Sequence, residues 1–289
     1  MSELVSRPKA VLIGIDGVPY DVLVSATCPA LRSLESRGRL WRTVLYPDER
    51  VPVLSGPGWA TVATGVWPKR HGIVANDFTG HRLLEHPDVL TRLTRHGFTT
   101  FAALGWAPLG NHIRGGPVFS DEITAKVVRD GDHDGYQAVD IVIAQEAARY
   151  VAQHSVDAAF VYFGLVDEIA DRRRSARAQW IAALEQTDRL VQEVLDAVSS
   201  RTSYEQEQWL VMVATDHSQL EGGGHGGFSR VEREAWMMAA VLDPDSKVME
   251  RSAVSAEIVD IAPTIASWFG SMQDASAFDG VTLFTPSQS

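Results

Sequence analysis

The chain has 289 residues, 45% of them hydrophobic and 22% charged, and its formal net charge at pH 7 is -11. This is the composition of a globular protein with a sizeable core, and the acidic balance argues against a nucleic-acid polymer as partner, because surfaces that bind phosphate backbones are basic. The single cysteine, Cys28, excludes an internal disulfide. No apolar run is long enough to cross a bilayer, and residues 1–10 lack the apolar core of a signal peptide, so we expect a soluble cytoplasmic protein.

Short apolar runs alternate with helical patterns along the chain. Strands are expected at residues 11–15, 44–46, 99–104, 158–163, 210–214 and 235–242. Helices are expected at residues 29–37, 55–64, 88–97, 136–154, 177–198 and 258–270. Pro263 interrupts the last helix and predicts a kink or a restart there.

This alternation predicts a doubly wound α/β fold, with a mostly parallel central sheet and helices on both faces. We expect a single domain over residues 1–289, because no repeat, low-complexity tract or clear linker divides the chain. Residues 108–136 show no periodicity and carry many Gly and Asp, so a loop-rich lid or excursion is expected there.

Acidic residues follow three of the expected strands. Asp16 comes directly after the first strand, Asp167 follows residues 158–163, and Asp216 follows residues 210–214. The carboxyl ends of parallel strands meet at one edge of the sheet, where open α/β sheets place their binding sites. We therefore expect these carboxylates to lie close together.

The third of these strands leads into the densest group of polar residues. Asp216 and His217 are followed by a glycine-rich loop that delivers His225. Asp and His are both zinc ligands, although a strand can also end on a capping Asp beside a surface loop. Neighbouring residues of a strand face opposite sides, so Asp216 and His217 can both be ligands only if the strand ends there.

Ser55 stands at the start of an expected helix, with Pro57 in the first turn and Gly65 at the end. Free backbone N–H groups at such a place favour an anion, and a serine there can act as a nucleophile beside it. Serine is also a favoured N-cap, and on this segment alone the cap is the stronger interpretation.

Asp171, four residues beyond Asp167, adds another carboxylate to this set. Together these groups meet one chemical need, which is a pair of divalent cations beside a hydroxyl nucleophile. Two cations can clamp the attacking and leaving oxygens of a phosphate ester, and metal coordination activates a serine hydroxyl.

The motifs resemble the alkaline phosphatase superfamily, in particular its nucleotide pyrophosphatase/phosphodiesterase branch. The similarity covers nearly the whole chain and lies in five separate segments in the same order as in that branch. They are Ile15-Asp16-Gly17, Ser55 to Ile73, Asp167, Thr215-Asp216-His217 with Gly224-His225-Gly226, and Ala262-Pro263-Thr264.

The resemblance implies an alkaline phosphatase-like three-layer fold and a role for each candidate residue. Asp16, Asp216 and His217, with the nucleophile Ser55, would hold one metal ion, and Asp167, Asp171 and His225 would hold the other. Zinc is the usual metal of this branch. Ser55 would form a covalent phospho-enzyme that water then hydrolyses.

Two positions depart from the family's pattern, and a third differs from the sulfatase branch. Asp171 stands where the family has a histidine, which makes manganese or magnesium possible at the Asp167/Asp171/His225 site. Gly58 stands where many members carry Asn, so the backbone N–H of Gly56, the metals or an arginine would have to stabilise the oxyanion. Trp59 stands where sulfatases carry arginine, which argues against a sulfatase.

Other polar and aromatic residues have less specific interpretations. His71 is expected to bind local backbone, and Trp59 and Trp106 are expected to fill the core rather than stack on a substrate. Arg172 to Arg174 are expected on a solvated helix face, with a phosphate clamp as the alternative. Substrate selectivity is expected in the loops at residues 79–86, 108–136 and 172–175.

The expected function is a two-metal phosphodiesterase or nucleotide pyrophosphatase acting on a small intracellular phosphate ester. A phosphomonoesterase with the same site is the first alternative. A degenerate member that binds a nucleotide without turnover is the second, because Asp171 replaces a metal-binding histidine. The sequence does not indicate an oligomeric state.

Overall fold

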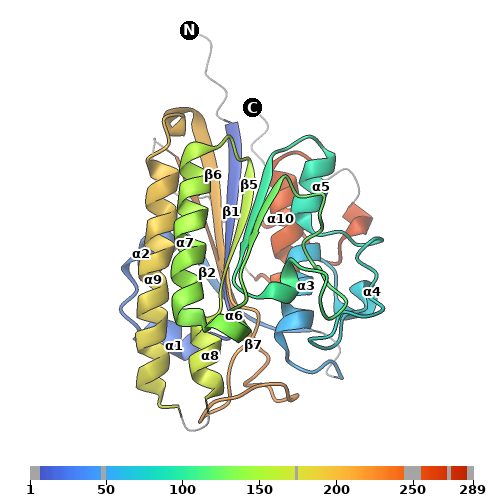
Figure 1. Cartoon of the computed structure of the whole chain (residues 1–289), viewed down its shortest axis with the longest axis vertical. Coiled ribbons are helices and arrows are strands. Elements are labelled where there is room, and N and C mark those ends of the chain that lie inside the picture. Colours follow the sequence, from blue (N-terminus) through green and yellow to red (C-terminus); the bar gives the residue numbers. More distant parts are fainter. Residues whose placement is uncertain (1–6, 47–49, 173–174, 244–254, 272–274, 285–289) are drawn as a thin grey trace.

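A computed structural model describes residues 7–46, 50–172, 175–243, 255–271 and 275–284. A seven-stranded sheet runs through its centre in the order β2-β7-β6-β1-β5-β3-β4 (Figure 1). The strands are β1 (Arg7–Ile15), β2 (Gly38–Val44), β3 (Thr100–Leu104), β4 (Ala125–Val128), β5 (Ala158–Phe163), β6 (Glu207–Ala214) and β7 (Glu234–Leu242).

The sheet is mostly parallel, as predicted. β1 pairs in parallel with β5 and β6, and β3 pairs in parallel with β4 and β5, whereas β7 runs antiparallel to both β6 and β2. The register places Ile15 beside Phe163 and Gly14 beside Ala214. The three central strands β1, β5 and β6 therefore end level with one another, at the edge where the candidate residues follow.

Helices cover both faces of the sheet and complete three layers (Figure 1). One side carries α1 (Tyr20–Ser25), α2 (Pro29–Arg37), α7 (Tyr136–Gln153), α8 (Leu165–Asp171) and α9 (Arg177–Ser199). The other carries α3 (Ser55–Thr64), α4 (Pro68–His71), α5 (Val89–Arg95) and α10 (Ile261–Trp268). Among the described helices, none has the length and apolar character needed to traverse a bilayer.

The core forms because the central strands are apolar on both faces. Val11, Ile13, Val161 and Val213 are fully buried, and each buried aliphatic side chain of this kind stabilises the fold by about 1.5–3 kcal/mol. Sequence periodicity located these strands because a buried parallel strand is a continuous apolar run.

One expectation about secondary structure was wrong. The strand expected at residues 44–46 is β2, which runs from Gly38 to Val44 and starts directly after α2. β2 lies at the edge of the sheet and is only partly buried, so it has no continuous apolar run. The segment 108–136, expected to be rich in loops, contains the edge strand β4 and the short helix α6 (Gly131–Asp134).

The interruption expected at Pro263 is a restart. A 3₁₀ turn over Ile258–Asp260 precedes α10, and Pro263 lies in the first turn of that helix. Proline is tolerated there because the first N–H groups of a helix have no partner within the helix.

One ion pair is buried at the start of β6. The guanidinium of Arg201 donates to both carboxylate oxygens of Glu207, at 2.8 and 3.0 Å, and the two side chains are 5% and 2% exposed. Ser203 and the indole of Trp209 also donate to Glu207. Burial alone would raise the pKa of Glu207, but these hydrogen bonds outweigh it and hold the pKa below its ordinary value.

Replacing Glu207 by Gln should lower the free energy of unfolding by about 3–5 kcal/mol, because Arg201 then stays buried without its counter-ion. The matched change at an exposed ion pair, Glu146→Gln beside Arg149, should have little effect, because solvent screens that pair. Urea denaturation of both variants measures the difference.

A lowered folded-state pKa contributes stability that is complete above the unfolded pKa and is lost as pH falls through the folded one. The deficit of Glu207→Gln should therefore shrink in acid, and a deficit that is constant with pH would contradict this account.

Candidate active site

The residues predicted to bind metal all lie at the carboxyl edge of the sheet. Asp16 follows β1, Asp216 and His217 follow β6, and His225 comes from the loop between β6 and β7. Asp167 and Asp171 lie on α8, directly after β5, and Ser55 is the first residue of α3. β6 ends at Ala214, so Asp216 and His217 are not constrained to opposite faces of a strand.

The first group combines Asp16, Asp216 and His217, whose ligand atoms lie within 4.8 Å of one another. His217 Nε2 is 3.4 Å from Asp16 Oδ1 and 3.5 Å from Asp216 Oδ2. The hydroxyl of Ser55 joins them, with its Oγ 3.3 Å from His217 Nε2 and 3.4 Å from Asp16 Oδ1.

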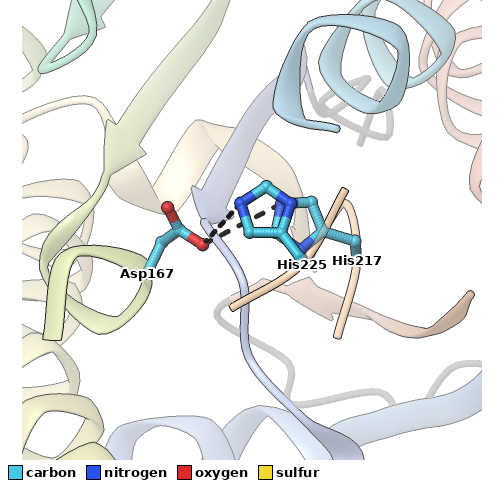
Figure 2. Close-up of side chains that lie close together, drawn as sticks. All are labelled: Asp167, His217 and His225. Atoms are coloured by element: carbon cyan, nitrogen blue, oxygen red, sulfur yellow. Dashed lines mark ion pairs between the residues drawn. The ribbon is translucent and has the colours of Figure 1, made fainter. Parts of the chain in front are cut away.

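The second group combines Asp167, His217 and His225. Figure 2 shows the Asp167 carboxylate pointing at both imidazoles, with Oδ1 3.5 Å from His225 Nε2 and 3.9 Å from His217 Nε2. The two imidazole rings stack with centroids 3.9 Å apart. Asp171 lies at the outer side, half exposed, with Oδ2 3.7 Å from His225 Nε2. His217 therefore stands between the two groups.

Ser55 is not a helix cap. The N-cap position of α3 is Leu54, and the Ser55 side chain makes no capping hydrogen bond. Its hydroxyl instead faces Asp16 and His217. The capping interpretation, which was the stronger one from this segment alone, is wrong because it could not include contacts with residues far along the chain.

Backbone carbonyls orient both imidazoles. Nδ1 of His217 lies 3.1 Å from the carbonyl of Ser218, and Nδ1 of His225 lies 2.9 Å from the carbonyl of Val53. Nδ1–H is the donor in each case, which leaves the Nε2 lone pair directed at the carboxylates. Burial holds the pKa of His217 well below its ordinary value, so this ring is neutral. A neutral imidazole with a free Nε2 is the form that binds metal.

The carboxylates are buried together without enough positive charge around them. Burial and repulsion from Asp16 raise the pKa of Asp167 and of Asp216 well above the ordinary range. Oδ2 of Asp216 is buried and has no hydrogen-bond partner. An orphaned buried carboxylate oxygen is costly, and a cation bound there would satisfy it. The residues thus fit a pair of divalent cations.

Two buried side chains fix the orientation of Asp16. The hydroxyl of Tyr162 and the indole N–H of Trp59 both donate to Oδ2, at 2.6 and 2.8 Å, and leave Oδ1 facing Ser55 and His217. Trp59 is fully buried, as expected for core packing. It also fixes the Asp16 carboxylate by a hydrogen bond, a role that the sequence did not indicate.

Two glycines allow the close approach of ligands. A Cβ on Gly58 would lie 2.8 Å from the Cβ of Asp216, so the asparagine that the family resemblance implied at this position has no room here. A Cβ on Gly17, whose φ is +65°, would lie 2.4 Å from Oδ1 of Asp167. Gln219 holds the same Asp167 oxygen by donating to it at 2.5 Å.

The expected role of Gly56 needs correction. Its backbone N–H donates to the side-chain oxygen of Asn76 at 2.7 Å, so it is not free to bind an oxyanion. Asn76 lines the cavity above Ser55, and its amide NH₂ can donate to a ligand there. Asn76 was missed because it lies in an irregular segment and gains its role only through contact with Gly56.

A cavity of about 460 Å³ opens over the site. Ser55, Asp167, Asp171 and His225 line it together with a second set of residues outside the predicted metal ligands. These are Asn76, Trp106, Arg114, Gly131, Asp132, Tyr136, Tyr162, Glu168 and Arg172. Several come from the segment 108–136, whereas none comes from residues 79–86.

Several other expectations can be compared with the described residues. His71 is fully buried, accepts the N–H of Ile73 and contacts the Thr61 hydroxyl, as expected for a structural histidine. Arg172 is exposed and bound to Glu168, but it also lines the cavity, and Arg173 and Arg174 lie outside the described residues. Trp106 is buried against Phe78 and lines the cavity as well.

A glycine-rich loop carries His225 to the site. Gly222, Gly223, Gly224 and Gly226 all have φ near +90° to +106°. A Cβ on Gly223 would lie 2.1 Å from the carbonyl oxygen of Ala170 on α8. Only glycine fits such a path, so the loop can pack directly on the helix that carries Asp167 and Asp171.

Asp140 supports the same helix from beneath. This fully buried residue of α7 accepts the backbone N–H of Gly164 at 3.1 Å and that of Leu165 at 2.9 Å. They belong to the N-cap residue and the first residue of α8, so Asp140 satisfies a helix N-terminus from another part of the chain. Periodicity showed α7 as an amphipathic helix but gave no sign of this contact.

Asp140→Ala should lower the free energy of unfolding by about 1–3 kcal/mol, because two buried N–H groups lose their acceptor. Asp140→Asn should be milder, since one amide oxygen can accept both N–H groups.

Burial raises the pKa of Asp140 to about 7 despite the backbone hydrogen bonds. The neutral form therefore favours folding, and this contribution is complete in acid and is lost as pH rises through about 7. Unfolding measured from pH 4 to 8 should show wild-type stability falling relative to Asp140→Asn, and parallel curves would contradict it.

Comparison with known proteins agrees with this geometry. Residues 10–237 match the family model described as type I phosphodiesterase / nucleotide pyrophosphatase. The chain belongs to this family. It is a phosphoric ester hydrolase of the alkaline phosphatase superfamily, as the motifs implied. A comparison with curated proteins found no match.

Solved structures share the fold of this phosphodiesterase family member. A 2-O GAG sulfatase aligns with a TM-score of 0.70 at 15% identity, over 96% of this chain and 73% of that one. A phosphonate monoester hydrolase from Silicibacter pomeroyi aligns with a TM-score of 0.69 at 14% identity, over 96% of this chain and 76% of that one. A second such hydrolase, from Agrobacterium radiobacter, aligns with a TM-score of 0.63 at 14% identity, over 91% and 74%. At this identity the likeness shows the alkaline phosphatase-like fold alone.

Proposed function

We propose that this family member hydrolyses a small phosphate ester in two steps, with Ser55 as the nucleophile beside two divalent cations. The observation that carries the proposal is the position of the Ser55 hydroxyl. Its Oγ lies 3.3 Å from His217 Nε2 and 3.4 Å from Asp16 Oδ1, at the N-terminus of α3 and in the wall of the cavity.

The clustered side chains divide into two proposed cation sites with different ligands. Asp16, Asp216 and His217, with Ser55, would hold one ion, and Asp167, Asp171 and His225 would hold the other. Bound cations would lower the pKa of the serine hydroxyl and neutralise charge on the phosphoryl oxygens. The mixed Asp and His ligands favour zinc. The additional carboxylate of Asp171 makes manganese or magnesium possible at the second site.

The protein's own groups then position the reacting atoms. Ser55 Oγ attacks phosphorus, the ester oxygen leaves, and water later cleaves the phosphoserine. The amide of Asn76 is placed to donate to a non-bridging oxygen, and the N-terminus of α3 favours negative charge at the same point. Tyr162 and Trp59 keep Asp16 turned toward Ser55 throughout.

Within this reaction class, a phosphodiester or nucleotide pyrophosphate is the substrate class that family membership supports. A cavity of about 460 Å³ is of the size that binds small molecules. Two further observations bear on the alternatives. The buried Trp59, bound to Asp16, occupies the position of the sulfatase arginine. The contact between Asp171 and His225 supports a functional second site over a degenerate one.

Ser55→Ala should reduce zinc- or manganese-supported hydrolysis of bis(p-nitrophenyl) phosphate by at least about 10³-fold, because the covalent step loses its nucleophile. Release of p-nitrophenol measures the rate. Metal analysis of the same variant should show that bound zinc persists, since the carboxylates and imidazoles remain. A fully active Ser55→Ala variant would remove Ser55 from the mechanism.

Zinc should also stabilise the folded protein independently of activity. A ligand at 100 times its dissociation constant adds about 2.7 kcal/mol to the stability of the state that binds it. The melting temperature of wild type should therefore rise with zinc and return with EDTA, and Asp216→Asn should show a much smaller rise. Equal zinc-dependent shifts in both proteins would place the ion away from Asp216.

A further inference from the structure

Arg114 lies in the wall of the catalytic cavity under an unusual backbone constraint. Its φ is 48°, in the left-handed region, and among the described non-glycine residues only Tyr46 shares a positive φ. Glycine adopts this conformation without strain, and Gly115 and Gly116 follow directly in the sequence. An arginine here carries backbone strain, which points to a role for its side chain.

The backbone of Arg114 is tied to the segment that carries Asn76. The carbonyl of Arg114 accepts the N–H of Phe78 at 2.6 Å, and a Cβ on Gly115 would lie 2.4 Å from the backbone nitrogen of Thr79. Asn76 in turn binds Gly56, the neighbour of Ser55. Ser55, Asn76 and Arg114 therefore lie in one continuous part of the cavity wall.

Within the described part of the chain, the positive charge of the Arg114 guanidinium has only a long ion pair to balance it. The one ion pair that the described residues give it is with Asp132, at 3.6 Å, and the arginine side chain is 51% exposed. Asp132 already accepts the indole N–H of Trp106 at 3.2 Å and the hydroxyl of Tyr136 at 3.0 Å. The other arginine in the cavity wall, Arg172, lies closer to its acid, at 3.1 Å from Glu168. Arg114 thus keeps donors for a ligand, and a guanidinium suits carboxylate and phosphate oxygens.

We propose that Arg114 is a specificity-determining residue that binds a second negative charge on the substrate, beyond the single charge of a simple phosphodiester. This rests on the proposed function. The second charge has two chemical sources: the phosphoryl group of a monoester, or a carboxylate or phosphate on the ester arm of a diester. Both present an anionic oxygen to the same guanidinium.

Three substrates with one leaving group separate these sources. Phenyl p-nitrophenyl phosphate carries one charge, p-nitrophenyl phosphate carries its second charge on the phosphoryl group, and 3-carboxyphenyl p-nitrophenyl phosphate carries it on the arm. Arg114→Asn should lower kcat/KM about 10- to 100-fold for at least one doubly charged substrate and less than about threefold for the singly charged one. Arg114→Lys should recover part of the loss, because it restores the charge without the planar fork.

The variants are chosen to separate charge from folding. Asparagine is one of the residues most tolerant of a positive φ, so Arg114→Asn relieves rather than adds backbone strain. Arg149→Ala is the matched control, since Arg149 is similarly exposed and paired with Glu146 away from the cavity. Its kcat/KM values should equal those of wild type, and thermal unfolding should show all variants folded.

Two outcomes would overturn the proposal: an equal loss on all three substrates, or no loss on either doubly charged one. Failure of the proposed function would look different, since wild type would hydrolyse none of the substrates. In that case calorimetric binding of inorganic phosphate to the zinc-loaded protein still tests Arg114. Weaker binding by Arg114→Asn than by wild type and Arg149→Ala would support its role, and equal binding would refute it.

Discussion

Mutual repulsion among buried carboxylates is the constraint on which this structure depends. Asp16 and Asp216 follow the neighbouring strands β1 and β6, and Asp167 and Asp171 lie one turn apart on α8, which follows the adjacent strand β5. In water such groups would separate, and in a low-dielectric interior they lose ionisation instead. The fold keeps them together by attaching each to a rigid element. The stability of the sheet and its core therefore offsets the free-energy cost of burying these carboxylates side by side.

The contacts that support Asp16 and Asp216 have one feature in common: each engages one oxygen of the carboxylate and leaves the other for a ligand. Tyr162 and Trp59 bind Oδ2 of Asp16, and Gly17 donates its N–H to Oδ1 of Asp216 at 3.3 Å. The two imidazoles are treated similarly, because backbone carbonyls take Nδ1 and leave Nε2. Supporting groups of this kind fix the direction of ligand lone pairs before any ion arrives.

Sequence reasoning reached the parts of this arrangement that follow from single segments. Asp16 and Asp216 stood out because continuous apolar runs end on them, and the same runs located the central strands in the sequence. β2 escaped because an edge strand is only partly buried and shows no such run. Asn76, Asp140 and Arg114 escaped for another reason: each acts through contacts with residues distant in sequence, such as Asp140 with Gly164. Ser55 shows the difference most directly: its own segment favoured a cap, the resemblance implied a nucleophile, and the tertiary contacts turn its hydroxyl toward Asp16 and His217.

The glycine-rich loop that carries His225 means that the candidate ligands are held in two different ways. Asp16, Asp216 and His217 leave adjacent strands within three residues of the sheet, whereas His225 reaches its partners at the end of an irregular chain segment. A change in the length or composition of that segment would shift one imidazole and leave the strand-borne ligands where they are. In the proposed two-cation site, divergence of this segment would therefore alter the affinity or identity of the ion held by His225, while Asp16, Asp216, His217 and Ser55 keep their geometry.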